Sequence, residues 1–496
     1  MSKIKTVKEK IIKDTFIYTI VQYGSSIFGF IGATAMRSFL GPYLIGIWSL
    51  LRVIIEYTLW GELGVATATT FKIPFFKGKG DHGKAKQIED VAFSFVFIMS
   101  VVSGLLILIG TFMLKDKLPA ELFAGLVFIS AYLCLERLYG YYLIILRAHS
   151  NFTVINKSVV FDSLVNLIFI FLLVKNFKMQ GLYLTVTILA CLNILFIHFL
   201  ARHRVSFTLK LNGEMAHLLK YGLPLLFVGM LNMILRSTDR IMIAKMLGVT
   251  YVGYYSIALL SKNYVSGLSN NFGIVTIPKI LEAYGKEENI EHIKKFVTIS
   301  AEVISYILPC FLGMLYLLIP IFVQTFLPKF IPGILAAQVL LLEIFFSSFC
   351  PQASQFITAL GKQSRMIPIN IGAIIINILA NYFFIKIGWG IAGVAVGTFM
   401  ATLFSSFLIL GYAMKHFTGY KEIIKFAIRC ILPLIYIIVV VFGCTYFIRP
   451  VNVCAGLAIQ VAVLIICCVP LLIYINKRTR ILSTIFNILF KRVKRK

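Results

Sequence analysis

Long apolar stretches recur along this chain and are the feature that most restricts its possible folds. A helix of roughly twenty apolar residues crosses the hydrocarbon core of a bilayer. Backbone N–H and C=O groups inside lipid must be hydrogen-bonded within the protein, so these stretches are interpreted as transmembrane helices. Their apolar residues are continuous rather than alternating, which argues against a membrane β-barrel. With 59% hydrophobic and 14% charged residues, the 496-residue chain is too apolar for a soluble fold.

The apolar pattern predicts an all-α polytopic membrane protein with about fourteen transmembrane helices. The spans are expected at residues 14–39, 43–71, 91–114, 119–146, 154–174, 179–201, 221–246, 250–277, 296–318, 333–360, 366–385, 389–414, 427–448 and 453–475. The first span is long and leads directly into further spans, so we interpret it as an uncleaved helix and not as a signal peptide.

The formal net charge of +28 is explained by membrane topology. If the N-terminus is cytoplasmic, only seven of the 48 Lys and Arg residues fall in loops on the outer side. Cytoplasmic loops carry the excess of basic residues in membrane proteins. We therefore expect a multi-pass protein of the cell membrane with both termini in the cytoplasm, and no nucleic-acid partner.

The two halves of the chain resemble each other. The segment LGPYLIGIWS at 40–49 matches LGVTYVGYYS at 247–256, an offset of 207 residues, and NLIFIFLLVK at 166–175 matches NILANYFFIK at 377–386. An offset of six helices, an even number, makes the two copies parallel, related by an axis along the membrane normal. The sequence therefore predicts two pseudo-symmetric six-helix lobes followed by two additional helices.

The repeat also gives the expected domain boundaries. They are an N-terminal six-helix lobe at 1–201, a cytoplasmic amphipathic linker at 202–220, a C-terminal six-helix lobe at 221–415, two additional transmembrane helices at 416–475, and a basic amphipathic tail at 476–496. The tail alternates apolar and basic residues, which suits a helix on the anionic inner surface of the membrane.

Charged residues inside the predicted spans are the candidate functional groups, because each is unfavourable at a lipid-facing position. Lys262 lies near the middle of the eighth span, and no acidic residue occurs within four positions of it. It therefore needs a partner from elsewhere in the fold. A ligand is one such partner, and a salt bridge to Glu343 or Glu62 is the structural alternative.

Several cations suit an anionic substrate. Arg52 lies six residues after Gly46, and Lys262 lies nine residues after the equivalent Gly253, so both are expected at similar depth facing the central axis. Two such cations would bind a diphosphate through charge-assisted hydrogen bonds. The remaining candidate substrate-binding residues are two arginines of the seventh span, which share a face, and two amides of the eighth, which would contact sugars: Arg236, Arg240, Asn263 and Asn270.

Three carboxylates within the spans are candidates for coupling transport to a proton or a sodium ion: Asp239, Glu56 and Asp162. No Walker sequence is present, which argues against ATP hydrolysis by this chain. GKGDHG at 78–83 fits GxGxxG formally, but no strand precedes it. No histidine or cysteine pattern has metal-ligand spacing, so neither a metal nor a cofactor is predicted, and an enzyme is not expected.

Six motifs carry a family resemblance: LGPYLIGIWSLL at 40–51, YGLP at 221–224, DRIMIAKMLG at 239–248, VGYYSIA at 252–258, Pro278, and NILANYFFIKIGWGIAGVA at 377–395. In this order they resemble the multidrug/oligosaccharidyl-lipid/polysaccharide exporter superfamily, and within it the Wzx-type polysaccharide flippases. The resemblance implies a two-lobe transporter that moves a lipid-linked oligosaccharide, usually on undecaprenyl diphosphate, to the outer leaflet for polysaccharides such as O-antigen or capsule. Implied partners are this anionic substrate, membrane lipids and polysaccharide-assembly proteins.

Three other functions stay open. A multidrug or cation antiporter of the same superfamily would favour an apolar cavity with carboxylates, which Lys262 argues against. A peptidoglycan-precursor flippase is separated only weakly by sequence. A membrane-embedded polymerase or glycosyltransferase would carry a large outer loop with catalytic residues, whereas the longest outer loop expected here is 319–332.

Overall fold

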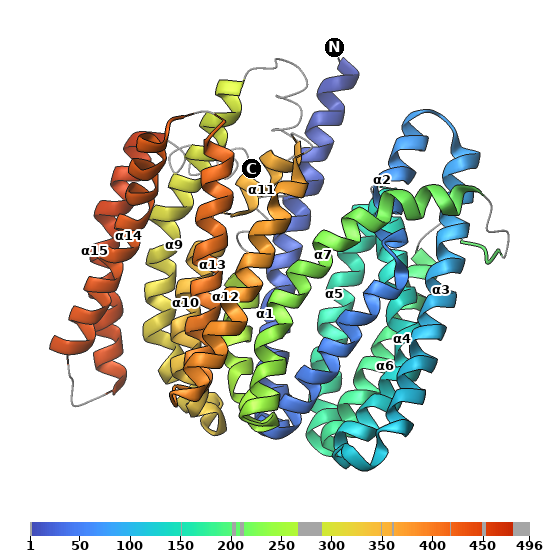
Figure 1. The fold of residues 1–496 in the computed structure, drawn as a ribbon, viewed down its shortest axis with the longest axis horizontal. Helices are drawn as coiled ribbons and strands as arrows, with labels where there is room; N and C mark the ends of the chain where they lie inside the picture. Colours follow the sequence, from blue (N-terminus) through green and yellow to red (C-terminus); the bar gives the residue numbers. More distant parts are fainter. Residues whose placement is uncertain are drawn as a thin grey trace, which may run out of the picture. The chain divides into compact units, whose positions relative to one another are not determined.

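A computed structural model of the chain describes residues 2–149, 151–200, 205–208, 213–265, 290–348, 350–359, 362–416, 418–448 and 453–479. These residues are helical almost throughout and contain no strand (Figure 1). Within them, ten helices are long and apolar enough to cross a membrane, or eleven if one bent pair forms a single span. Each of the fourteen predicted spans falls on helix over most of its described length, which confirms the all-α polytopic fold.

The chain divides into two compact units, Met1–Ser256 and Ile257–Lys496. The first unit contains α1 (Ser2–Tyr57), η1 (Thr58–Glu62), α2 (Val65–Gly78), α3 (His82–Met113), η2 (Lys115–Lys117), α4 (Ala120–Ala148), α5 (Phe152–Phe169), η3 (Ile170–Val174), α6 (Lys175–Leu200) and α7 (Gly213–Met246). A further helical segment is described over 249–265 and crosses from the first unit into the second.

Positive backbone angles mark the main breaks in the first unit. Gly41, at φ 75°, bends α1 between the first two predicted spans, and Pro42 begins its second part. Leu63 and Gly64, at φ 47° and 76°, end η1 and separate it from α2. The predicted second span, 43–71, is therefore a broken helix.

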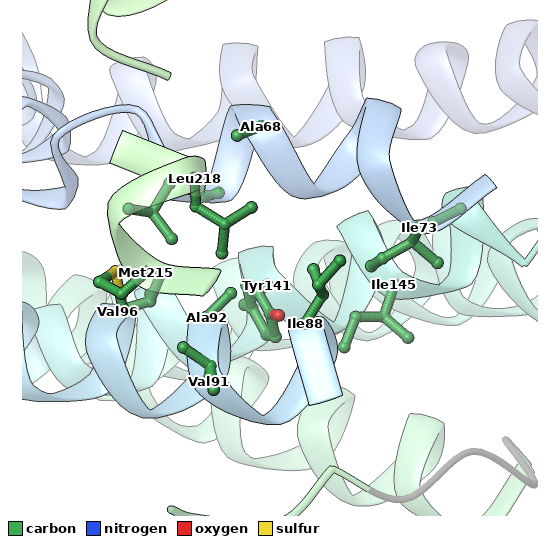
Figure 2. Close-up of a cluster of buried hydrophobic side chains, with 13 residues drawn as sticks. Ala68, Ile73, Ile88, Val91, Ala92, Val96, Tyr141, Ile145, Met215 and Leu218 are labelled. Atoms are coloured by element: carbon green, nitrogen blue, oxygen red, sulfur yellow. The ribbon is translucent and has the colours of Figure 1, made fainter. Parts of the chain in front are cut away.

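The start of α7 packs into the core of the first unit. Met215 and Leu218 are buried there among side chains of α2, α3 and α4 (Figure 2). The backbone N–H of Ser206 donates to Asp90 of α3 at 2.8 Å. The described part of the predicted linker is thus held against the first unit by apolar and polar contacts.

The two copies of the repeated motif contact each other reciprocally within the first unit. A Cβ on Gly46 would meet the carbonyl oxygen of Val249, and a Cβ on Gly253 would meet that of Pro42. Pro42 and Val249 occupy equivalent positions in the repeat, as do the two glycines. Because only glycine permits so close a backbone approach, the repeated glycines are explained by this contact.

The second unit contains α9 (Ile290–Phe326), η4 (Pro328–Gly333), α10 (Ile334–Ser347), α11 (Cys350–Ala359), η5 (Gln363–Arg365), α12 (Met366–Lys386), α13 (Gly390–Met414), α14 (Tyr420–Phe447) and α15 (Val453–Thr479). Helix α13 packs against α12 and α10, while α14 and α15 pack against α9 and each other (Figure 1). The single span predicted at 333–360 is two helices, α10 and α11. Most of the predicted tail lies outside the described residues.

Candidate functional site

Charged side chains in the spans of the first unit form ion pairs between different helices. Arg52 of α1 lies 3.4 Å from Glu136 of α4. Arg240 of α7 lies 3.0 Å from Glu56 of α1. Arg52 and Glu56, four residues apart on α1, therefore pair with separate helices. Such pairs reduce the free-energy cost of charges inside the membrane.

Arg137 shows what a structural arginine looks like in this unit. Its side chain is 10% exposed and lies 3.5 Å from Glu62. It also donates hydrogen bonds to the carbonyl of Ile55 at 2.5 Å and to the hydroxyl of Thr58 at 2.7 Å. The last carbonyls of a helix have no intrahelical donors and attract cations, so Arg137 caps the end of α1.

Arg52 differs from Arg137 in its exposure. Its side chain is 43% exposed, and Glu136 is its ion-pair partner. A guanidinium has five N–H donors, and a single contact to one carboxylate oxygen leaves most of them available. Arg52 can therefore bind a second anion while it keeps Glu136.

The other candidates on α7 have distinct surroundings. Asp239 is buried and accepts a hydrogen bond from the hydroxyl of Tyr255 at 2.9 Å. Arg240 is largely buried in its pair with Glu56. Arg236 is exposed and makes neither a hydrogen bond nor an ion pair within the described part of the chain. Of the two α7 arginines predicted to bind substrate, Arg236 is the one with its donors uncommitted.

Asp162 of α5 contacts a buried amide of α6. Its Oδ1 accepts a hydrogen bond from the amide of Asn193 at 2.5 Å. Asn193 Oδ1 is buried and has no hydrogen-bond partner among the described residues. Buried oxygen atoms without donors favour a proton or a small hard cation. Of the three candidate coupling carboxylates, Asp162 has the surroundings best suited to that role.

Lys262 forms an ion pair with Glu343 within the second unit. Its Nζ lies 3.0 Å from Glu343 Oε1, and the side chains are 21% and 3% exposed. The hydroxyl of Thr402 donates to the same oxygen at 3.3 Å. Glu343 Oε2 is buried and has no hydrogen-bond partner in the described chain. The structural alternative foreseen for Lys262 is therefore present, with Glu343 as its partner.

The two candidate amides are only partly described. Asn263 follows Lys262 and is exposed. Asn270 lies outside the described residues. Arg52 and Lys262 belong to different units, so the predicted alignment of these two cations is not described. Asn193 was not among the predicted residues, although an amide in the middle of the apolar run 179–201 is a signal that could have identified it.

Comparison with known proteins gives one family and a shared fold. A family described as "Polysaccharide biosynthesis protein" matches residues 83–330. No curated protein sequence matches the chain. The structure is similar to that of the lipid II flippase MurJ in an inward closed conformation, with a TM-score of 0.69 at 14% identity, covering 93% of this chain and 99% of that one.

Two further solved structures have the same fold. One is an inward-facing multidrug resistance MATE family transporter of the MOP superfamily, with a TM-score of 0.64 at 14% identity, covering 83% of this chain and 99% of that one. The other is a MOP superfamily transporter from Pyrococcus furiosus, with a TM-score of 0.55 at 17% identity, covering 81% and 93%. At these identities the likeness shows the fold, and substrate must be argued from the site.

Proposed function

Because this chain belongs to the polysaccharide biosynthesis protein family, we propose that it is a flippase for a lipid-linked oligosaccharide. The substrate would be carried on undecaprenyl diphosphate and moved from the inner to the outer leaflet for surface polysaccharide assembly. The fold shared with the lipid II flippase MurJ supports this reading. The protein would lie in the cell membrane with both termini cytoplasmic, and polysaccharide-assembly proteins would be its partners.

One observation carries the proposal: a half-exposed arginine lies inside the membrane span and keeps most of its donors available. Arg52 is that residue, in contrast to the buried Arg137. Phosphate oxygens are strong acceptors, and a guanidinium binds them in a bidentate manner. We assign Arg52 to the diphosphate, with Arg236 as a second exposed cation of the same unit.

Lys262 has a different role in the proposal because it already has a carboxylate partner. A phosphate that competes for Lys262 would leave Glu343 buried without its cation. Removing the cation from a buried ion pair costs free energy, so phosphate binding at Lys262 would be weaker than at the more exposed Arg52. The exposed amide of Asn263 would contact sugar hydroxyls.

Asp162 is the proposed coupling group. A sodium ion or proton at Asp162 would also provide a partner for the buried oxygen of Asn193. The driving force would then be an ion gradient, and the chain would transport without covalent chemistry. Asp239 and Glu56 are assigned structural roles, because each already has a partner on another helix.

The test is the leaflet distribution of undecaprenyl-linked oligosaccharide in cells that lack this protein, with surface polysaccharide scored in parallel. Accumulation on the cytoplasmic face and loss of surface polymer, both restored by the wild-type gene, would support the flippase. An unchanged distribution accompanied by new drug sensitivity would instead favour a multidrug antiporter. Accumulation of peptidoglycan precursor would identify that lipid as the substrate.

A further inference from the structure

Two arginines from two helices share one buried carboxylate in the second unit. Glu302 of α9 is buried, and its Oε1 lies 3.1 Å from Nη1 of Arg429 on α14 and 3.0 Å from Nη2 of Arg478 on α15. Arg478 also donates to the hydroxyl of Tyr474 at 3.3 Å. We call Glu302, Arg429 and Arg478 the Glu302 cluster.

The Glu302 cluster carries a net positive charge with donors to spare. Two guanidinium groups face one carboxylate, which leaves one positive charge. The Arg429 and Arg478 side chains are 41% and 40% exposed. Within the described part of the chain Arg429 bonds only to Glu302, and Arg478 only to Glu302 and Tyr474. Each guanidinium has five N–H donors, so most of them remain available for an anion.

The Glu302 cluster lies at the depth where lipid headgroups begin. Arg478 stands beside Lys477 in the last turn of α15, after its apolar part, and Glu302, which Arg478 contacts, lies at the same depth. Arg429 lies in the third turn of α14, which packs beside α15 and α9 (Figure 1). The ends of apolar spans meet the interfacial region of a bilayer.

Exposed apolar side chains continue from the Glu302 cluster along both outer helices. On α14 they include Ile428 and Leu432, and on α15 they include Ile473 and Val469. A ligand that combines a phosphate with hydrocarbon chains matches this arrangement, in which an arginine cluster adjoins two apolar helix faces. The phosphate would meet the arginines, and the chains would lie along the apolar faces.

We propose that the Glu302 cluster binds the phosphate of an anionic glycerophospholipid of the bilayer. A phosphodiester carries one negative charge, which balances the net charge of the cluster. A diphosphate carries more, so the carrier lipid of the proposed substrate is a poorer match. The site uses α9, α14 and α15, and none of its residues belongs to the proposed transport site.

Native mass spectrometry of the full-length protein tests the site, with phosphatidylglycerol as the anionic probe and phosphatidylcholine as the zwitterionic one. Wild-type protein should retain phosphatidylglycerol in preference. Arg478→Gln and Arg429→Gln should each weaken that retention roughly tenfold, because each removes charge-assisted hydrogen bonds to the phosphate. Lys477→Gln is the matched control: it removes the same charge from the next residue, which is exposed and makes no contact with Glu302.

Glu302→Gln distinguishes a lipid-binding site from a purely structural clasp, that is, a cluster of ion pairs that only holds α9, α14 and α15 together. It removes the competing carboxylate, so phosphatidylglycerol should bind more tightly, whereas a clasp alone predicts no gain. If Glu302→Gln does not fold, the two arginine variants decide, because each keeps one Arg–Glu pair. Equal retention of the two phospholipids, an equal loss in Lys477→Gln, or displacement by undecaprenyl diphosphate at equal concentration would overturn the proposal.

Discussion

At the scale of single residues, side-chain exposure separates the arginines with a structural role from those that can bind a ligand. Arg137→Ala removes the cap of α1 and leaves Glu62 buried without its cation, so we expect a loss of about 3 kcal/mol of stability. Arg52→Ala breaks a half-exposed pair, which is worth about 1 kcal/mol or less. Translocation should nevertheless be strongly reduced. Thermal unfolding and a vesicle translocation assay measure the two effects, and normal transport by Arg52→Ala would contradict the phosphate role.

The ion pair of Lys262 and Glu343 permits a sharper separation of structure from transport. Lys262→Gln leaves a buried carboxylate unpaired and should destabilise the protein by about 3 kcal/mol. The double variant Lys262→Gln/Glu343→Gln should recover most of that stability, because a neutral pair needs no charge compensation. Transport by the double variant should stay lost, because the cation that would bind the substrate phosphate is absent. A double variant that is both stable and active would show that the pair is only structural.

Asp162 carries the prediction about coupling. Asp162→Asn removes the negative charge of this carboxylate while it keeps the size of the side chain. We expect transport in vesicles to lose its response to an imposed sodium or proton gradient. Asp116→Asn, in the exposed loop between α3 and α4, loses the same charge and should respond like the wild type. A wild-type response in Asp162→Asn would eliminate this site as the coupling group.

Sequence reasoning identified which residues needed partners but not which partners they have. The unpaired position of Lys262 followed from the absence of acids within one turn. The choice of Glu343 over Glu62 depends on tertiary packing, which places Thr402 beside the same oxygen. Arg52 and Glu56 lie four residues apart on one face of α1, yet each pairs with a different helix, because tertiary packing brings Glu136 and Arg240 within reach of them.

At the scale of elements, the repeated glycines carry a prediction about packing. Gly46→Ala and Gly253→Ala each place a methyl group on a backbone carbonyl, which cannot retract as a side chain can. We expect each to destabilise the protein by about 1–3 kcal/mol. Gly24→Ala, in the open part of α1, should be neutral or stabilise by up to about 1 kcal/mol. Thermal unfolding measures all three, and a neutral Gly46→Ala would contradict the close contact.

The sequence predicted where helices cross the membrane better than where they break. Hydrophobicity fixes a span, because lipid contact requires it over the whole segment. The break at Leu63 and Gly64 depends on two backbone conformations that hydrophobicity does not record, although the glycines in WGELG at 60–64 were a local signal. Arg137 binds the carbonyl of Ile55 just before α1 changes to η1, and hydrophobicity does not record that change either.

At the scale of the whole molecule, the fold followed from the apolar pattern and the internal repeat. The apolar pattern arises from a constraint that acts on every residue of a span, whereas the repeat was visible through matching residues such as Gly46 and Gly253. Substrate and orientation do not follow from the fold in the same way. They depend on a few charges and on the distribution of Lys and Arg between loops.

Orientation is therefore the last prediction. In a variant without its native cysteines, Lys117→Cys should react with a membrane-impermeant thiol reagent added to intact cells, because the α3–α4 loop is expected outside. Lys79→Cys, exposed between α2 and α3, should react only after the membrane is opened. Both positions lie in loops of the first unit and exchange the same side chain, so they differ only in the predicted face of the membrane. The reverse labelling would invert the topology and place the proposed substrate entry on the wrong leaflet.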